Sequence, residues 1–544
     1  MKKTAIIIAA MVASVQAYAG GYLTNTNQNA AFGRNLSQEA KIDITSTYAN
    51  PAGIAFLNKG WHFALSNQSA FQTRTVESTF GDNLFALGTV NGIKNQSGTK
   101  TFKGKATAPL IPSFDLAYVQ DRWSVALHFA ISGGGGKCTF DDGLGSFESQ
   151  VAMLPALANA LQPGSATGYS FDTYMKGRQY YFGTQVMGTF KVTNNLSLAA
   201  GVRMVNASCA YDGYVKNIGL EVGGQIVPAA QLLTAAGLGE MAPMVADRVL
   251  DCTQSGTGFT PFVGIDWKIN EHWNIAAKYE FMTALRLKNS TASVKNEDGS
   301  VTELNAGLSE YSDGTKIDAY IPAILTLGAE YSPIKAVRLN AGGHIFFDKQ
   351  ATQHSNRHEK LDGPGWEILA GAEWDINKIV TVSAGWQNTS YGLGKNSEFI
   401  TDMSFVTNSN SIGVGARIHV SKKVALDISY FKTLYTHYKR EQPDYNHVKE
   451  TMAAKVAPMG EALANAQSAL TAAYANPELQ AGIQAGDPTA LAQKGYLDQQ
   501  AATLQQKAQM LQSVQTSMAD FNTAGSDNFT RTNDVIGIGV VLDF

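Results

Sequence analysis

The chain has 544 residues, of which 44% are hydrophobic and 10% aromatic, and its formal net charge is −3. A charge this close to neutral argues against nucleic acid as a partner. The 52 Gly and only 15 Pro, with no later apolar run long enough for a membrane helix, are typical of a transmembrane β-barrel and not of a soluble α/β protein.

The first 19 residues have the features of a secretory signal peptide. Lys2 and Lys3 supply positive charge, Ala5–Val15 is a short apolar core, and Ala17-Tyr18-Ala19 fits a cleavage site. The apolar core is too short to cross a bilayer as a helix, which needs roughly 20 residues. We therefore expect residues 1–19 to be removed on export, so that the mature chain begins at Gly20.

The next segment, residues 20–60, is polar and irregular. It has no helical or strand period and ends in the turn-forming run Asn50-Pro51-Ala52-Gly53. Such a segment is normally disordered or a functional loop, but ahead of a closed barrel it can also fill the lumen.

From residue 61 to 544 the chain alternates between apolar and polar residues, as strands with two different faces do. In the last strand Ile536, Ile538 and Phe544 share one face, while Gly537 and Asp543 lie on the other. In a transmembrane barrel the apolar face contacts lipid and the other face lines a polar lumen. About fourteen strands are expected, an even number as bacterial barrels have. Their predicted cores are 61–79, 107–120, 122–134, 171–193, 195–215, 257–269, 272–288, 316–332, 335–348, 365–376, 379–391, 405–420, 423–438 and 529–544.

An even strand count places both ends of the mature chain on the periplasmic side and the long loops outside. Residues 146–162 and Val227–Leu250 in two of these loops have helical patterns. The last loop, about 440–528, is rich in Ala and Gln. Asp487-Pro488 predicts a helix start there, and two apolar faces joined at Asn476-Pro477 predict a helical hairpin. This insertion is either a self-packed knob or a partner-binding or shielding element.

Three cysteines in an exported chain leave at least one thiol unpaired. Cys209 and Cys252 flank one loop, and we predict a disulfide between them; three free thiols are the alternative. The nine His are scattered and no Cys pair has zinc-ligand spacing, so neither metal nor cofactor is expected. His354-Ser355 has no catalytic motif beside it. No catalytic residue is predicted, and the chain is not expected to be an enzyme.

A polar N-terminal segment that ends in Asn-Pro-Ala and precedes such a barrel resembles the FadL family. These are outer-membrane transporters of long-chain fatty acids and other hydrophobic compounds, including aromatic hydrocarbons. The residues that carry the resemblance are Gly21-Tyr22, Gly33-Arg34 with Ser37 and Glu39-Ala40, Asn50-Pro51-Ala52, the strand pair Asp115–Gly136 and the terminal strand.

The resemblance implies that residues 20–60 fold into the lumen as a hatch whose first residues, Gly20, Gly21 and Tyr22, help to form an inner apolar site. Asn50, Pro51 and Ala52 would fix the end of this hatch, and we predict that they lie inside the barrel wall. It also implies a kink in the third strand that opens the wall sideways to the membrane. Gly133, Gly134, Gly135 and Gly136 end that strand and either form this kink or only terminate the strand.

The expected protein is a monomer in the bacterial outer membrane, surrounded by lipid and lipopolysaccharide, with a hydrophobic small molecule as its substrate. No residues that contact the substrate can be assigned from the sequence. A surface-exposed interaction or scaffold barrel that works through its helical insertion is the alternative, and a general porin is a third reading.

Overall fold

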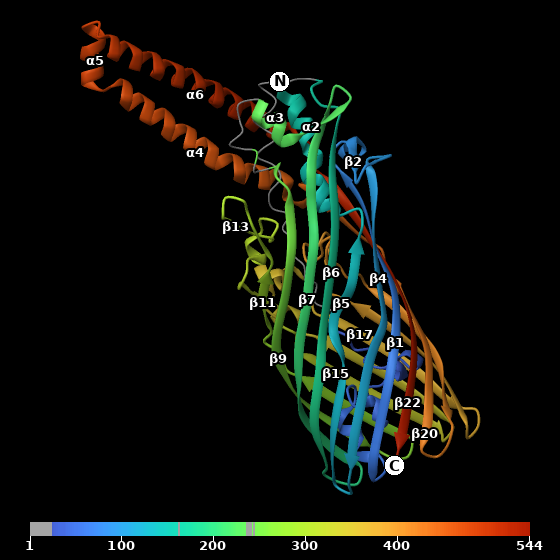
Figure 1. Cartoon of the computed structure of the whole chain (residues 1–544). Helices are drawn as coiled ribbons and strands as arrows, with labels where there is room; N and C mark the ends of the chain where they lie inside the picture. Colours follow the sequence, from blue (N-terminus) through green and yellow to red (C-terminus); the bar gives the residue numbers. More distant parts are fainter. Residues whose placement is uncertain (1–23, 162–163, 236–241, 243–244) are drawn as a thin grey trace.

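The structure, a computed structural model, describes residues 24–161, 164–235, 242 and 245–544. Fourteen antiparallel strands form a closed barrel (Figure 1), which confirms the predicted fold class. The barrel is closed because its first strand, β1 (Gly60–Phe80), pairs on one side with β4 (Thr99–Val119) and on the other with the last strand, β22 (Gly525–Asp543).

Each remaining wall strand pairs with the wall strands next to it in sequence. These strands are β5 (Trp123–Phe140), β6 (Gly168–Lys191), β7 (Leu196–Val222), β9 (Arg248–Lys268), β10 (Trp273–Glu280) continued by β11 (Arg286–Thr291), β14 (Lys316–Asp318) continued by β15 (Ile324–Ile334), β16 (Val337–Phe346), β17 (Gly365–Asp375), β18 (Val380–Ser390), β19 (Ser409–His419), and β20 (Val424–Tyr435) continued by β21 (Tyr438–Gln442). Each overlaps one of the predicted strand cores. Short strands outside the wall are β2 (Gly88–Val90), β3 (Ile93–Lys94), β8 (Gln225–Pro228), β12 (Ser293–Lys295) and β13 (Val301–Glu303).

Alternation along each strand separates an apolar outer face from a polar inner one. In β17, Trp366, Ile368 and Trp374 are exposed on the outside, whereas Glu367 and Glu373 are buried inside. The exposed aliphatic side chains of the other strands repeat this arrangement and give the barrel an apolar outer surface. No helix in the described ranges is long and apolar enough to cross a bilayer.

The wall is much taller on one side than on the other. β6 and β7 have 24 and 27 residues, whereas β16 and β17 have 10 and 11. The tall strands carry the helices of the long loops, and the C-terminus lies at the opposite end of the barrel (Figure 1). The short turns and the long loops therefore lie at opposite ends, as the alternation of connection lengths predicts.

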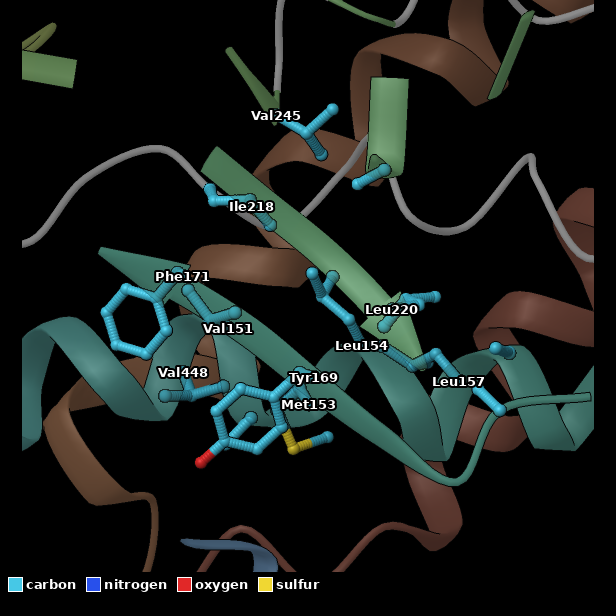
Figure 2. Packing of buried hydrophobic residues seen from close by; sticks show 14 of the residues in the cluster. Val151, Met153, Leu154, Leu157, Tyr169, Phe171, Ile218, Leu220, Val245 and Val448 are labelled. Carbon is cyan, nitrogen blue, oxygen red and sulfur yellow. The ribbon is translucent and has the colours of Figure 1, made fainter. Parts of the chain in front are cut away.

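Several long loops pack together into a cap on the tall side. The helix α2 (Gly145–Leu161) places Val151, Leu154 and Leu157 against Tyr169 of β6 and Leu220 of β7 (Figure 2). The same cluster takes in side chains from η4 (Leu84–Leu87), α3 (Ala229–Ala235) and the first turns of α4 (Val448–Tyr474). The cap thus has an apolar core of its own above the lumen.

The late insertion is a helical hairpin that projects from this cap (Figure 1). It consists of α4, α5 (Pro477–Gln484) and α6 (Pro488–Asp520). Asp487 caps α6 by accepting a hydrogen bond from Thr489 N at 2.8 Å, as predicted. The outer half of the hairpin has a separate apolar cluster around Leu470, Leu479 and Leu497, so it packs mainly on itself.

The helical expectation for Val227–Leu250 is correct at Ala229–Ala235, which form α3, and wrong at Arg248–Leu250. α3 ends at Ala235, residues 236–241 and 243–244 lie outside the described part, and Arg248–Leu250 begin β9. Leu250 pairs with Gly213 of β7, so its apolar side chain belongs to a strand that packs on a neighbouring strand. The remaining short helices are η6 (Ser309–Tyr311), η7 (Asp348–Gln350), η8 (His354–Lys360) and η9 (Tyr445–His447).

Candidate functional site: the filled lumen and the wall beside β5

The N-terminal segment, residues 24–59, lies inside the barrel as three short turns. They are α1 (Ala30–Arg34), η2 (Ile44–Ser46) and η3 (Pro51–Phe56). Each turn starts from an Asn or Asp whose side chain accepts a hydrogen bond from the backbone of the turn, namely Asn29, Asp43 and Asn50. Such caps satisfy backbone donors without a neighbouring strand or a long helix, which explains how a segment without regular period is ordered.

Asn50, Pro51 and Ala52 lie within the wall, as predicted for their position. Asn50 and Ala52 are 2% and 0% exposed. The Asn50 Nδ2 donates to Asp266 of β9, and the Ala52 carbonyl accepts from Ser197 Oγ of β7 at 2.6 Å. The three residues therefore fasten the end of the segment to two strands of the tall side. Their part in gating stays a prediction.

Buried ion pairs hold the middle of the segment to the short side of the barrel. Glu373 of β17 accepts from Arg34 Nη1 and from Lys41 Nζ, both at 2.6 Å. Arg34 Nε also lies 2.9 Å from Asp427 of β20. All four side chains are nearly inaccessible to solvent. Because a charge left alone at such a place is costly, these pairs fix the segment in one position.

Further contacts extend this attachment around the barrel. Arg417 of β19 joins Asp43 of the segment to Asp427. Glu39 lies 3.4 Å from His344 Nε2 of β16, and Lys278 of β10 donates to the Tyr48 carbonyl at 2.7 Å. Sequence alternation predicted that ionisable side chains line the lumen, but their partners in the segment could not be assigned, because that requires the register of distant strands.

The beginning of the described segment is attached to β5. Thr24 forms a β-bridge with Gly133, and Asn25 N donates to Ser132 O at 3.0 Å. The Asn25 side chain donates to Ile131 O at 2.9 Å. The predicted hatch residues Gly20, Gly21 and Tyr22 lie just before this point and outside the described residues.

The strand β5 is irregular at Gly133–Gly136. Gly133 pairs with Tyr181 and Gly136 with Gln179, so two residues of β5 face the single Tyr180 of β6. Gly134 and Gly136 have φ of +97° and +67°, and a Cβ on Gly134 would lie 2.5 Å from the Gln179 carbonyl oxygen. Glycine is needed at this bulge. The strand continues to Phe140, so the four glycines do not end it.

On its other side, β5 loses its pairing with β4. The two strands pair at Lys105 with Thr139 and again at Phe114 with Phe129, with no paired residues between these points. Pro109 and Pro112 of β4 fall within this stretch, and proline has no N–H for a sheet ladder. Prolines on β4 and the glycine bulge on β5 together account for the interrupted ladder.

Two cavities meet beside this interruption. The larger, about 210 Å³, lies between the start of the N-terminal segment and the wall. The smaller, about 50 Å³, lies nearer the long loops. Both are bordered by Gly135 and Gly136. The larger also reaches the β4 edge of the interruption at Thr107, Ala108 and Ile111. The lumen is thus connected to the one stretch of the β4–β5 pair that lacks a ladder.

The predicted disulfide between Cys209 and Cys252 is absent, and both thiols are free, as is that of Cys138. Both residues lie within paired strands, where Cys209 is opposite Gln254 and Cys252 opposite Tyr211. They are therefore diagonal neighbours, which lie roughly 7–8 Å apart with their Cβ atoms only somewhat closer, whereas the two Cβ atoms of a disulfide are about 3.5–4.5 Å apart. The sequence pattern places the two cysteines on either side of a loop because it underestimates the lengths of these strands. In the structure β7 extends to Val222 and β9 already begins at Arg248.

His354 and Ser355 lie in η8 of the loop between β16 and β17. Ser355 has φ of +54°, and the nearby His358 Nδ1 accepts a hydrogen bond from Gln353 N at 3.2 Å. Within the described ranges no group of three or more His, Cys, Asp or Glu residues is arranged to hold a metal ion.

Comparison with known proteins identifies the fold. No protein-family model matches the sequence, and no curated protein matches it. Among solved structures, a Pseudomonas aeruginosa FadL homologue aligns with a TM-score of 0.55 at 14% identity, covering 96% of this chain and 100% of that one. The Pseudomonas putida toluene transporter TodX aligns with a TM-score of 0.50 at 12% identity, covering 96% and 99%.

A deletion mutant of the TodX monoaromatic hydrocarbon channel gives a TM-score of 0.53 at 12% identity, over 95% and 99% of the two chains. These matches extend over nearly the whole of each barrel, while the sequences have diverged almost completely. The chain therefore has the fold of the FadL-type barrels.

Proposed function

We propose that the chain is a channel of the bacterial outer membrane that takes up hydrophobic compounds, such as long-chain fatty acids or aromatic hydrocarbons, without a chemical reaction. The fold that it shares with a FadL homologue and a toluene transporter supports this function. The apolar outer surface of the barrel suits contact with lipid. After removal of residues 1–19, residues 20–60 act as the hatch and residues 61–544 as a monomeric barrel.

The proposed orientation puts both ends of the mature chain in the periplasm. The cap and the helical insertion at about 440–528 then lie outside, among lipopolysaccharide. This arrangement gives an arriving compound a surface at the outer mouth, while the N-terminal segment obstructs a straight aqueous route through the lumen. A compound released into the bilayer avoids transfer into water, which is unfavourable for apolar surface.

The observation that carries the proposal is the interrupted ladder between β4 and β5, which the larger cavity reaches. A compound passes from the loops through the two cavities and leaves sideways between these strands. Gly133–Gly136 keep the opening in place, and the hatch, with Gly20–Tyr22 at its start and Asn50–Ala52 at its end, guides the compound toward it.

A covalent bridge across the opening tests this route. Thr107 and Lys137 are exposed and border the larger cavity from the two strands. With the three native cysteines replaced by serine, Thr107→Cys and Lys137→Cys are joined by a short bifunctional thiol reagent. Uptake of labelled dodecanoate, dodecan-1-ol and toluene by cells is expected to fall to the level of cells without the protein.

The matched control bridges the same two strands where their ladder is intact, at Tyr118→Cys and Val125→Cys. This bridge should leave uptake unchanged. Uptake that persists after complete bridging of positions 107 and 137 would contradict sideways release. If none of the three compounds enters faster with the unmodified protein than without it, uptake itself is the wrong function.

The projecting hairpin favours one alternative, a surface barrel that works through its insertion. Replacing residues 463–507 by a short linker removes the outer apolar cluster but keeps the first turns of α4 and the end of α6, which pack in the cap. If transport takes place through the barrel, uptake should be unchanged in this variant. Loss of partner binding with normal uptake would assign the hairpin a separate role.

A further inference from the structure

Two arginines face each other on the strands that close the barrel. Arg74 of β1 and Arg531 of β22 are direct cross-strand partners. Both side chains point into the lumen and are only 8% and 6% exposed. Like charges directly opposite each other destabilise a sheet, and a guanidinium does not relieve the repulsion by losing its proton. A pair of this kind needs a compensating negative charge.

The described part of the chain offers these arginines only neutral partners. Arg74 donates from Nη2 to Gly135 O at 2.8 Å. Arg531 makes two long contacts, to Phe405 O at 3.5 Å and to Gln72 Oε1 at 3.4 Å. The buried Nε of each has no partner there. At least one strong donor of each guanidinium is therefore unused.

Other buried basic side chains of the lumen differ in this respect. Arg34, Lys41, Arg203, Lys278 and Arg417 each lie beside a carboxylate. Arg357 and Arg440, which are buried beside the long loops, donate to backbone carbonyls instead. The cations that face the N-terminal segment thus have acids beside them, whereas Arg74 and Arg531, which line the cavities, have none in the described residues.

The arginine pair lies where the two cavities meet. Arg531 lines the larger cavity and Arg74 the smaller, and both cavities share Gly135 and Gly136. The Arg531 guanidinium lies over the ring of Tyr435, 4.9 Å from its centroid, which orients its planar face. Apolar side chains line the cavities on both sides of the pair: Phe32, Ile111 and Phe431 in the larger, and Phe140, Met175 and Phe405 in the smaller.

We propose that Arg74 and Arg531 together bind a single oxyanionic head group of the transported compound, while its apolar chain lies in the adjoining cavities. The assignment rests on the proposed uptake function and narrows its substrates to amphipathic anions. An oxyanion satisfies both unused Nε donors and replaces the neutral Gly135 carbonyl as the acceptor for Arg74. Charge-assisted bonds from two guanidinium groups are short and strong.

Glu367 also lines the larger cavity, and its charge is already compensated. Its oxygens accept from His344 Nδ1 at 2.7 Å, from Gln387 Nε2 at 2.6 Å and from Thr26 Oγ1 at 3.1 Å. It does not contact either arginine. A bound anion thus meets the uncompensated positive charges of Arg74 on β1 and Arg531 on β22. The carboxylate of Glu367, across the cavity, does not repel it strongly because its charge is compensated.

Equilibrium binding to the full-length protein in a non-ionic detergent tests the site with two probes of equal chain length, dodecanoate and dodecan-1-ol. Dodecanoate is expected to bind at least about tenfold more tightly. Arg74→Gln and Arg531→Gln should each weaken dodecanoate binding by about 10- to 100-fold and leave dodecan-1-ol unaffected. Arg531→Lys, which keeps the charge, should retain part of the preference.

Arg122→Gln is the matched control, because Arg122 is exposed in the turn between β4 and β5, far along β4 from the interruption. It should change neither affinity. The slower migration of every variant after heating in detergent gels verifies that the barrel has folded. A third probe, phosphatidylglycerol, is tested for its ability to displace dodecanoate. This competition shows whether the ligand of the site is an imported acid or a membrane lipid with an anionic head group.

Three results would overturn the assignment. They are equal affinity of the native protein for the two probes, equal weakening of both by the arginine substitutions, and displacement of dodecanoate by phosphatidylglycerol at lower concentration. Cell uptake separates this inference from the proposed function. If dodecan-1-ol enters through the protein but dodecanoate has no advantage, only the head-group site is wrong.

Discussion

Replacing Glu373 by Gln should release the N-terminal segment without breaking the barrel. Glu373 Oε1 accepts from both Arg34 and Lys41 at 2.6 Å, and Oε2 accepts from Arg338 Nε at 3.1 Å. In the variant, Arg34 keeps its contact with Asp427. Lys41 has no second carboxylate within 4 Å in the described residues and is 6% exposed, so a buried ammonium loses its counter-charge.

Removing one partner of a buried ion pair costs about 3–5 kcal/mol. This cost falls on the attachment of residues 24–59, because the Glu373→Gln substitution leaves the strand pairing of β17 intact. The fraction of molecules with a detached segment should rise by roughly 150- to 4,000-fold. Hydrogen exchange in residues 24–59 measures this directly, and planar-bilayer recordings should show a larger mean current.

Two further variants complete the experiment. Asp375→Asn removes a neighbouring acid of β17 that contacts Arg338 and Thr381 but not the N-terminal segment, and it should leave exchange in that segment unchanged. Lys41→Met combined with Glu373→Gln removes the unpaired ammonium of Lys41 and should recover much of the protection from hydrogen exchange. Exchange in residues 24–59 that is the same in Glu373→Gln as in the native chain would refute the idea that these ion pairs hold the segment.

The remaining predictions concern the bulge and one loop. Gly134→Asn should reduce uptake and slow barrel assembly, because its Cβ meets the Gln179 carbonyl, whereas Gly136→Asn has open space around its Cβ and should be tolerated; equal effects would exclude the steric explanation. Burial raises the pKa of Asp348 to about 6 from 3.8, so the folded loop binds this proton more tightly. The free energy of unfolding of this loop is therefore greatest below about pH 4, and it falls by about 1.4 kcal/mol per pH unit up to about pH 6. Asp348→Asn, which can still accept from Gly365 N, should make protease resistance of residues 347–364 independent of pH in this range; a native-like pH dependence in the variant would assign it to another group.

The strands and the segment inside them could be predicted because their signals are local. Alternation fixes which face of a strand is apolar, so the outward position of Trp366 and Ile368 and the inward position of Glu373 follow from sequence. Asn50-Pro51 and Asp487-Pro488 cap the turns that their residue types favour. The same local reasoning located the irregularity at Gly133–Gly136, since left-handed backbone and close approach are properties of glycine.

Register could not be predicted, and the wrong disulfide and the missed arginine pair both depend on it. A shift of two residues separates Cys209 from Cys252 and excludes the disulfide. The pairing of Arg74 with Arg531 joins residues from the first and last strands, which nothing near either residue in the sequence reveals. The error at the end of Val227–Leu250 has another reason. An apolar run of this kind is compatible with a helix or with a buried strand, and in the structure its last three residues begin β9 on the tall side of the barrel.

The attachment of the N-terminal segment sets an order for assembly of the molecule. Residues 24–59 are synthesised before any wall strand, yet Arg34 and Asp43 find their partners on β17, β19 and β20, more than 330 residues later. The seam of β1 with β22 joins positions still further apart, such as His62 and Asp543. All other wall strands pair with their neighbours in sequence and can be added one hairpin at a time, so the slowest, most non-local steps come last. A chain that stops before β17 has nowhere to place the charges of Arg34 and Lys41 and keeps two unpaired sheet edges. Completion of the wall and docking of the first-made segment thus become a single late event, which only the full-length chain can reach.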